Sequence, residues 1–313
     1  MKRVVSVSLG SSARDHRCVV EFLGEQIEVA RIGTDGDLKR AVALLRELDG
    51  RVDALGLGGI DRYLVAGGRR YEIRDALKLV RAVRRTPVVD GSGLKNTLER
   101  EVVRYLQKEL GMDLAGRRVL LVSAVDRFGL AEALAEAGAD LVCGDLIFAL
   151  GLPFPLHSLG SLRRLAAVLL PILTRLPFTL LYPTGKKQDK AKPRHGRFFA
   201  RADLIAGDYL FVKRNMPADL AGKTILTNTV TPGDVEDLRV RGVRLLVTTT
   251  PELSGRSFGT NVMEALLVAV SGRRPEEMTP ADYLDWLRRL SFKPRVVEFG
   301  RDRSRGMAGA GGA

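Results

Sequence analysis

The sequence predicts an α/β protein with mainly parallel sheets, helices on both faces and Rossmann-like βαβ units. Over most of the 313 residues, short apolar segments that end in glycines alternate with stretches whose apolar residues recur at helical spacing. In addition, DLAGRRVLLVS (113–123) is echoed by DLAGKTILTNT (219–229), and a helical stretch, a glycine and a second apolar strand follow each copy. This echo indicates two βαβ units in the second part of the chain.

The elements of the first part follow from these patterns in order. RVVSVSL is a strand, and Gly24 divides HRCVVEFLGEQIEVARI into the two alternating segments of a hairpin. Apolar residues at helical spacing from Leu38 to Leu48 predict a helix that stops at Asp49-Gly50. Next come the strand VDALGLGG, the helix IRDALKLVRAVRR and the strand TPVVDGSG.

Between and after the two βαβ units, the patterns predict further helices and strands. They predict an apolar helix over 159–175, the strand FTLLYPTG, a strand in ADLIAGDYLFV and the helix TNVMEALLVAVSG. A helix capped by Thr279, with Pro280 in its first turn, precedes PRVVEF as a last edge strand. We therefore assign 1–112 to an N-terminal α/β domain, 113–300 to a Rossmann-like domain and the Gly/Ala-rich 301–313 to a disordered tail.

Composition excludes several classes of protein. The hydrophobic content of 45% suffices for a buried core, while arginines and a proline interrupt the longest apolar stretch, so we expect no membrane span and a cytoplasmic location. The two cysteines lie far apart and there are only three histidines, which argues against a metal site. The net charge of +13 comes from arginines spread over every helix, which indicates a solvated surface rather than a nucleic-acid partner. A homodimer is left open.

Ligands of parallel sheets bind beyond the carboxyl ends of the strands, which here means the loops after residues 8, 57, 89, 123, 145, 184 and 248. One of these loops holds Gly91-Ser92-Gly93, and Asn96 and Glu99 follow it at the spacing of a capping box. SGRSFGTNVMEA repeats the construction with Arg256, Asn261 and Glu264. Each turn is either an anion site at a helix start or a tight strand-to-helix connection that needs glycine.

The unit that begins at residue 119 has Rossmann-like proportions, and Asp145 lies about where a ribose-binding acid belongs, although G-x-G-x-x-G is missing. The cofactor predicted for this fold is NADP or NAD. The candidate cofactor residues are Ser123, Asp126, Arg127, Asp145, Thr249 and Arg256. The basic loop GKKQDKAKPRHGR (185–197) is either a lid over an anionic substrate or a solvated segment.

The runs VDALGLGGIDRYL, TPVVDGSGLKNTLERE and TTTPELSGRSFGTN resemble, across nearly the whole chain, a bacterial family labelled quinate 5-dehydrogenase. The resemblance implies NAD(P)-linked oxidation of a ring hydroxyl on a cyclic polyhydroxy carboxylate such as quinate or shikimate. Quinate/shikimate dehydrogenases hold the substrate carboxylate with a Ser-x-Ser pair, which Ser6-Val7-Ser8 matches. They use a lysine and the aspartate of a Thr-Asp-Gly motif as the catalytic pair.

The resemblance thus implies that Lys95 and Asp35, in Thr34-Asp35-Gly36, are catalytic, although in that family the lysine precedes the motif. The implied substrate residues are Ser6, Ser8, Asp90, Ser92 and Lys186. Two alternatives belong to other classes. Gly10-Ser11-Ser12 resembles the phosphate-binding start of the acetate-kinase and actin-like superfamily, which implies an ATP-dependent phosphotransferase whose magnesium Asp35 or Asp61 holds. The other alternative is a non-catalytic ligand sensor.

Overall fold

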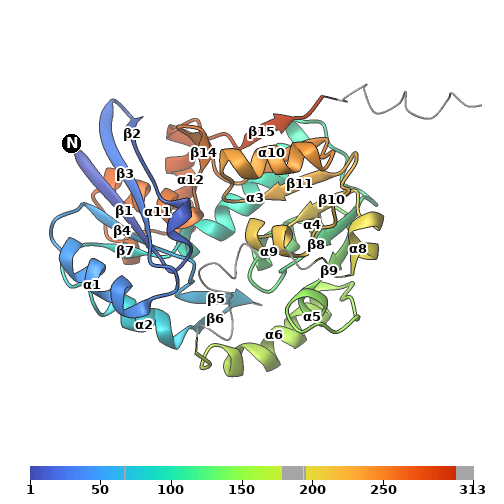
Figure 1. The fold of residues 1–313 in the computed structure, drawn as a ribbon, viewed down its shortest axis with the longest axis horizontal. Helices are drawn as coiled ribbons and strands as arrows, with labels where there is room; N and C mark the ends of the chain where they lie inside the picture. The colour runs from blue at the N-terminus through green and yellow to red at the C-terminus, as the bar shows by residue number, and fades with distance from the viewer. Residues whose placement is uncertain (67, 178–192, 194, 301–313) are drawn as a thin grey trace, which may run out of the picture.

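The computed structural model describes residues 1–66, 68–177, 193 and 195–300, and it confirms the predicted α/β class (Figure 1). The first sheet has the strand order β2-β3-β1-β4-β7 and the second β15-β12-β11-β10-β8-β9. Within these two sheets, neighbouring strands are parallel except for the pairs β2–β3 and β12–β15. Among the described residues, no helix is both long and apolar enough to cross a membrane.

The first sheet contains β1 (Lys2–Ser8), β2 (His16–Phe22), β3 (Glu25–Gly33), β4 (Ala54–Gly58) and β7 (Val88–Val89). The predicted β2–β3 hairpin is confirmed. On β1, Val5 and Val7 face the core formed with α1 (Leu38–Leu48) and α2 (Arg74–Val80), whereas Val4 faces the opposite core. A small hairpin of β5 (Tyr63–Ala66) and β6 (Arg69–Glu72), which no pattern predicted, follows β4.

The second sheet contains β8 (Arg118–Leu121), β9 (Asp140–Cys143), β10 (Leu204–Ala206), β11 (Thr224–Thr227), β12 (Leu245–Thr248) and β15 (Arg295–Glu298). Helix α4 (Phe128–Glu136) joins β8 to β9 and α10 (Pro232–Val240) joins β11 to β12, so both predicted βαβ units are confirmed. The remaining elements here are α5 (Asp145–Phe148), α6 (Leu159–Leu173), α8 (Gly196–Arg201), α9 (Tyr209–Asn215) and the short pair β13 (Glu252–Leu253) and β14 (Arg256–Ser257). The predicted strand FTLLYPTG and most of the basic loop lie outside the described residues.

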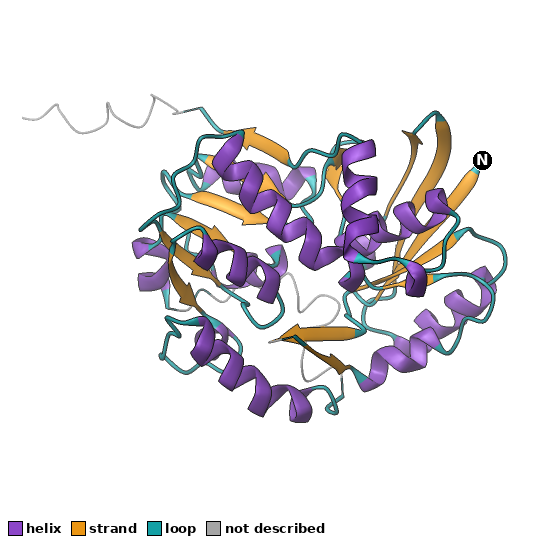
Figure 2. Ribbon diagram, turned by 180° about the vertical axis from the view of Figure 1, so that it is seen from behind, coloured by secondary structure: helices purple, strands orange, loops and turns teal. Residues whose placement is uncertain are grey.

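Two C-terminal helices return to the first sheet, although the predicted boundary assigns their residues to the second domain (Figures 1 and 2). Nine of the twelve residues of α11 (Thr260–Ser271) are buried, and with α12 (Pro280–Arg289) they share a core with Val4, Ala54 and Leu94. A helix that is apolar almost all round must be covered on every side. The first sheet and α3 (Ser92–Lys108) supply that cover. The chain therefore passes from the first sheet to the second, returns to the first sheet at α11 and α12, and passes a third time to reach β15.

The Gly91-Ser92-Gly93 turn holds a carboxyl group of the protein itself. Glu264, from α11, accepts a hydrogen bond from Gly91 N at 2.7 Å and another from the Tyr283 hydroxyl at 2.7 Å. A Cβ atom at Gly93 would collide with this carboxyl group, so Gly93 has to lack a side chain. The hypothesis that this turn binds a ligand anion is therefore wrong, because Glu264 fills the position.

The two predicted capping boxes are also wrong. Helices α3 and α11 begin four and one residues earlier than Asn96 and Asn261, with Gly91 and Gly259 as their N-caps. Asn261 instead donates to Ser6 Oγ at 2.7 Å, and Glu99 accepts hydrogen bonds from α4. Helix α3 starts directly at its glycine turn, because Gly91 adopts the left-handed conformation (φ 95°) that closes such a turn. Gly259, before α11, is extended (φ −69°) instead.

Burial, followed by the nearby Asp90, raises the pKa of Glu264 to about 8 from its ordinary value of 4.5. The folded protein therefore holds this proton more tightly than the unfolded chain, so its contribution to stability should be lost as pH rises from about 4.5 to 8. In Glu264→Gln, which stays neutral, this loss should be absent. In urea unfolding, the free energy of unfolding of the variant relative to that of the wild type should be higher at pH 8 than at pH 5.5. Glu47→Gln, at an exposed position of α1, is the control; an equal gain there would contradict the prediction.

Candidate active site

A cavity of about 370 Å³ lies where the carboxyl ends of the strands of both sheets face each other. Of the seven loops that the strand-end rule selects, those after residues 8, 57, 89, 123 and 145 line this cavity, and the loop after 248 contributes Arg256. The loop after 184 lies outside the described residues. The cavity walls toward α5 and α6 are apolar, and they include Leu146, Leu150, Leu165, Leu169 and Leu173.

Lys95 lies between two carboxylates in this cavity. Its Nζ atom is 3.1 Å from Asp61 Oδ2 and 2.9 Å from Asp126 Oδ1. Lys95 projects from the first turn of α3, Asp61 follows β4 and Asp126 lies in the turn between β8 and α4. The three side chains are 15–21% exposed, so they are shielded from bulk water while they line the cavity.

The pKa values of the three groups are shifted in different directions by their surroundings. Burial, and then the adjacent Asp126, raise the pKa of Asp61 well above its ordinary value, although Lys95 opposes this. Burial also acts on Asp126, but Lys95 and Arg127 outweigh it and hold the pKa of Asp126 below its usual range. The carboxylates likewise outweigh burial for Lys95 and raise its pKa. Asp61 is therefore the carboxyl group that keeps its proton to the higher pH, whereas Asp126 is ionised and Lys95 is an ammonium ion at neutral pH.

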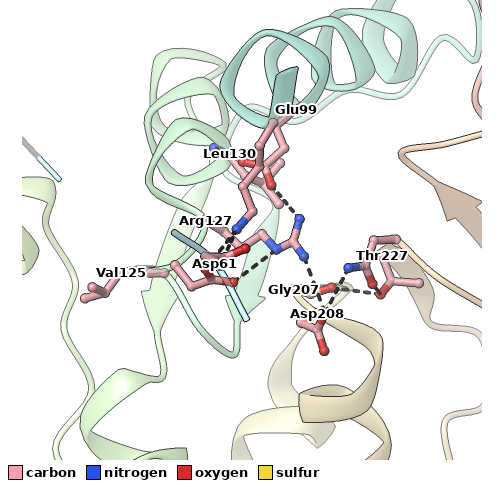
Figure 3. Close-up of polar contacts among 12 residues, drawn as sticks. Asp61, Glu99, Val125, Arg127, Leu130, Gly207, Asp208 and Thr227 are labelled. Atoms are coloured by element: carbon pink, nitrogen blue, oxygen red, sulfur yellow. Dashed lines mark hydrogen bonds and ion pairs between the residues drawn. The ribbon is translucent and has the colours of Figure 1, made fainter. Parts of the chain in front are cut away.

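Arg127 fixes the second-sheet side of this cluster (Figure 3). Its guanidinium group is 2.7 Å from Glu99 Oε1 and 3.4 Å from Asp208 Oδ2, and only 5% of its side chain is exposed. Glu99 also accepts from Leu130 N at 3.2 Å, so this carboxylate occupies the start of α4. Arg127 thereby holds α3, α4 and the turn after β10 in one arrangement around Asp126.

The Ser-x-Ser pair also lines the cavity. Ser6 Oγ accepts from Asn261 Nδ2 at 2.7 Å, while Ser8 Oγ accepts from Arg31 Nη2 at 3.0 Å and Gly10 N at 3.1 Å. Both hydroxyls act as acceptors in these bonds. Their O–H groups can therefore donate to an oxygen atom of a ligand.

The structure does not pair Lys95 with Asp35. Asp35 lies in the turn before α1 with φ 54°, where its Oδ1 accepts from Ser12 N at 2.8 Å, and it does not line the cavity. Helix α1 is capped by Asp37 instead. The Thr-Asp-Gly match is thus a turn that closes on the loop after β1. Lys95 contacts Asp61 and Asp126 instead of Asp35, the partner that the resemblance implied.

The candidate cofactor residues do not form a dinucleotide site at the turn after β8. The Asp145 carboxylate accepts from Ala124 N at 3.1 Å and Val125 N at 2.9 Å, and burial raises its pKa to about 6. With Glu99 on Leu130 N, carboxylates of the protein already occupy the amides that would hold a pyrophosphate. Asp145 therefore binds the turn rather than a ribose, and these residues do not fit NAD or NADP bound in the Rossmann manner.

The other predicted site residues are divided between the cavity and its surroundings. Ser123, Asp126, Arg127 and Arg256 line the cavity, whereas the buried Thr249 does not. Asp90 lines it while accepting bonds from Arg62 N and Ser92 Oγ, which fix the base of the β5–β6 hairpin. Lys186 lies outside the described residues.

Sequence reasoning missed several cavity residues, chiefly Arg14, Arg31, Asp208, Asn228 and Asn261 as ligand-facing groups. Arg14 and Arg31 come from a 3-10 turn and from β3, and no local motif marks them. Asp61 carried a usable signal, since it follows Gly58-Gly59 at a strand end, but nothing in the sequence pairs it with Lys95.

The comparisons with known proteins identify the family of this chain, and that family has no named activity. No curated protein matches the chain. Similar solved structures include shikimate 5-dehydrogenase from Thermus thermophilus in complex with shikimate, with 14% identity, a TM-score of 0.37 and coverage of 92% of this chain and 98% of that one. A galactofuranose binding protein has 13% identity, a TM-score of 0.35 and coverage of 93% and 99%. An NAD-dependent malic enzyme from Thermotoga maritima has 12% identity, a TM-score of 0.35 and coverage of 92% and 84%.

Two family models match adjacent parts of the sequence. Domain of unknown function (DUF8753) matches residues 3–90, and domain of unknown function (DUF8754) matches residues 93–299. Because the second match covers more than half of the 313 residues, the chain belongs to the DUF8754 family.

Proposed function

We propose that this protein is an enzyme that binds a small polyhydroxylated anion and transfers a proton at one of its hydroxyl or carbonyl oxygens through Lys95. The observation that carries this proposal is the position of Lys95 Nζ, 2.9 Å from Asp126 and 3.1 Å from Asp61 in a cavity between two sheets. Titratable groups whose pKa values are driven apart by their surroundings are typical of acid–base sites.

Each member of the cluster has a chemical role in this proposal. The Lys95 ammonium ion stabilises negative charge that develops on a substrate oxygen and donates a proton to it. Asp61, when protonated, can return a proton to Lys95 across 3.1 Å. Asp126 remains ionised and holds the ammonium group in position. In the opposite direction Asp61 starts ionised: Lys95 passes a proton to Asp61 and takes one from a substrate hydroxyl.

Within this class, the narrower reaction we propose is the interconversion of a ring hydroxyl and a ketone on a cyclic polyhydroxy carboxylate such as quinate or shikimate. In this reaction Lys95 handles the hydroxyl proton, and a nicotinamide dinucleotide taken up as co-substrate accepts or supplies the hydride. The resemblance implies this reaction, and Ser6 and Ser8, its implied carboxylate ligands, line the same cavity as Lys95. The turn after β8 does not fit NAD or NADP, so we assign no residue of that turn to the dinucleotide.

Two assays on the purified protein test the proposal. The first follows the absorbance of reduced nicotinamide with quinate or shikimate and either NAD or NADP. The second follows, by proton NMR in D₂O, the exchange of carbon-bound hydrogens next to the corresponding ketone, which needs proton transfer but no redox partner. A signal in either assay supports an acid–base enzyme, and only the first supports the redox reaction. Ligand-induced thermal shifts without a signal in either assay would replace the enzyme with a binding protein.

Lys95→Met should lower turnover by about 10²- to 10⁴-fold, the usual contribution of a positioned acid or base. Asp35→Asn should keep turnover within a factor of about two of the wild type, because Asp35 lies outside the cavity. The measurement is the initial rate of each variant at saturating substrate. The melting temperature of each variant checks that it is folded. Full activity in Lys95→Met would remove this lysine from the mechanism.

Asp61→Asn should change the pH profile of kcat/KM. Asp61 supplies its proton only while protonated, so the wild-type rate of the protonating direction should fall as pH rises through the raised pKa of Asp61. In Asp61→Asn, the rate should be lower at every pH, and the fall of the rate with rising pH should be absent. An unchanged fall in the variant would show that another group titrates.

A further inference from the structure

Three arginines gather at one end of the cavity, from segments far apart in the sequence. Arg14 lies in the 3-10 turn after β1, Arg31 on β3 and Arg256 on β14, and all three line the cavity. Arg256 Nη1 donates to the backbone oxygen of Arg14, so the Arg256 side chain lies against the turn that carries Arg14. The side chains of Arg14 and Arg31 are each 11% exposed.

Carboxylates compensate only part of this charge. Arg31 is 2.8 Å from Asp15, and Arg14 is 3.0 Å from Asp234, which Lys213 also contacts at 2.8 Å. Among the described residues, Arg256 has no ion-pair partner, and its Nε and Nη2 atoms have no hydrogen-bond partner. Burial, followed by Arg14 and Arg31, lowers the pKa of Arg256 to about 10. The protein therefore keeps a guanidinium group that is 3% exposed, lies over the Phe258 ring and has no ion-pair partner among the described residues.

Burying these charged groups lowers the stability of the fold unless a ligand of opposite charge binds beside them. A buried charge without a partner lowers the stability of the fold, so an uncompensated arginine in a cavity wall indicates a missing anion. A second feature points the same way. Helix α11 begins beside this end of the cavity, its N-cap Gly259 provides no side-chain cap, and Gly259 and Thr260 both line the cavity. Its partial positive charge adds to that of the arginines.

We infer that Arg14, Arg31 and Arg256, with the start of α11, form a subsite for the phosphate group of a small phosphomonoester. The inference deepens the proposed function and rests on it, since the phosphate would be a second anionic group on a phosphorylated form of the polyhydroxy compound whose oxygen Lys95 protonates. A phosphate dianion offsets two positive charges and offers oxygens in three directions, which suits several guanidinium forks. A carboxylate would offset a single charge and bind through one planar edge.

Isothermal titration of the full chain with inorganic phosphate tests the inference, and acetate serves as the competing carboxylate probe. Arg256→Gln and Arg31→Gln should each weaken phosphate binding by about tenfold or more. Arg118→Gln is the matched control, because it removes the same charge from an exposed ion pair at the amino end of β8, away from the cavity. Urea unfolding of each variant accompanies the titrations. Arg256→Gln should unfold no more easily than the wild type, because it removes an uncompensated buried charge.

Saturable phosphate binding that depends on both arginines and not on Arg118 supports the subsite. Acetate binding as tight as phosphate binding, no phosphate binding, or unchanged binding in Arg256→Gln with lowered stability would overturn it. The two failures are separable because phosphate binding needs no turnover. Arginine-dependent phosphate binding without any proton transfer would remove the proposed function alone, and turnover without phosphate binding would remove the subsite alone.

Discussion

The contact of Lys95 with Asp61 and Asp126 is the interaction on which the arrangement of the site depends. It joins a loop of the first sheet, the first turn of α3 and a turn of the second sheet at one ammonium group. Three ionisable groups this close cannot all be charged without cost, so the pKa of Asp61 is raised while that of Asp126 is lowered. The cluster holds the two sheets together, and in the proposed function the same groups transfer the proton beside the cavity.

Carboxyl groups of the protein occupy most of the places where an α/β fold usually binds anions. Glu264 fills the turn before α3, Glu99 the start of α4, and Asp145 the turn after β8. Each of these internal carboxyl groups takes amides that a pyrophosphate would otherwise use. Uncompensated positive charge is left at the end of the cavity that Arg14, Arg31 and Arg256 line. In this fold we therefore infer that arginine side chains, rather than the backbone amides of glycine turns, bind the anion.

The path of the chain explains how those arginines meet. After building most of the second sheet, the chain returns through α11 and α12 to cover the first sheet. The segment with Arg256 lies on this return path and contacts the loop after β1, which carries Arg14. Residues 242 positions apart in the sequence thereby share one wall of the cavity. The cavity consequently depends on the return of the chain to the first sheet.

The sequence by itself determined the α/β class, the β2–β3 hairpin, both βαβ units and most of the cavity-forming loops, because apolar periodicity and strand-end glycines are local signals. Lys95, Ser6 and Ser8 could be selected from short motifs. Only the tertiary structure decided their partners: Asp61 and Asp126 replaced Asp35, Glu264 filled the glycine turn, and Asp145 bound backbone amides. These contacts join segments up to 173 residues apart, and they follow from which strand ends and helix starts the packing brings together. No local pattern encodes that proximity.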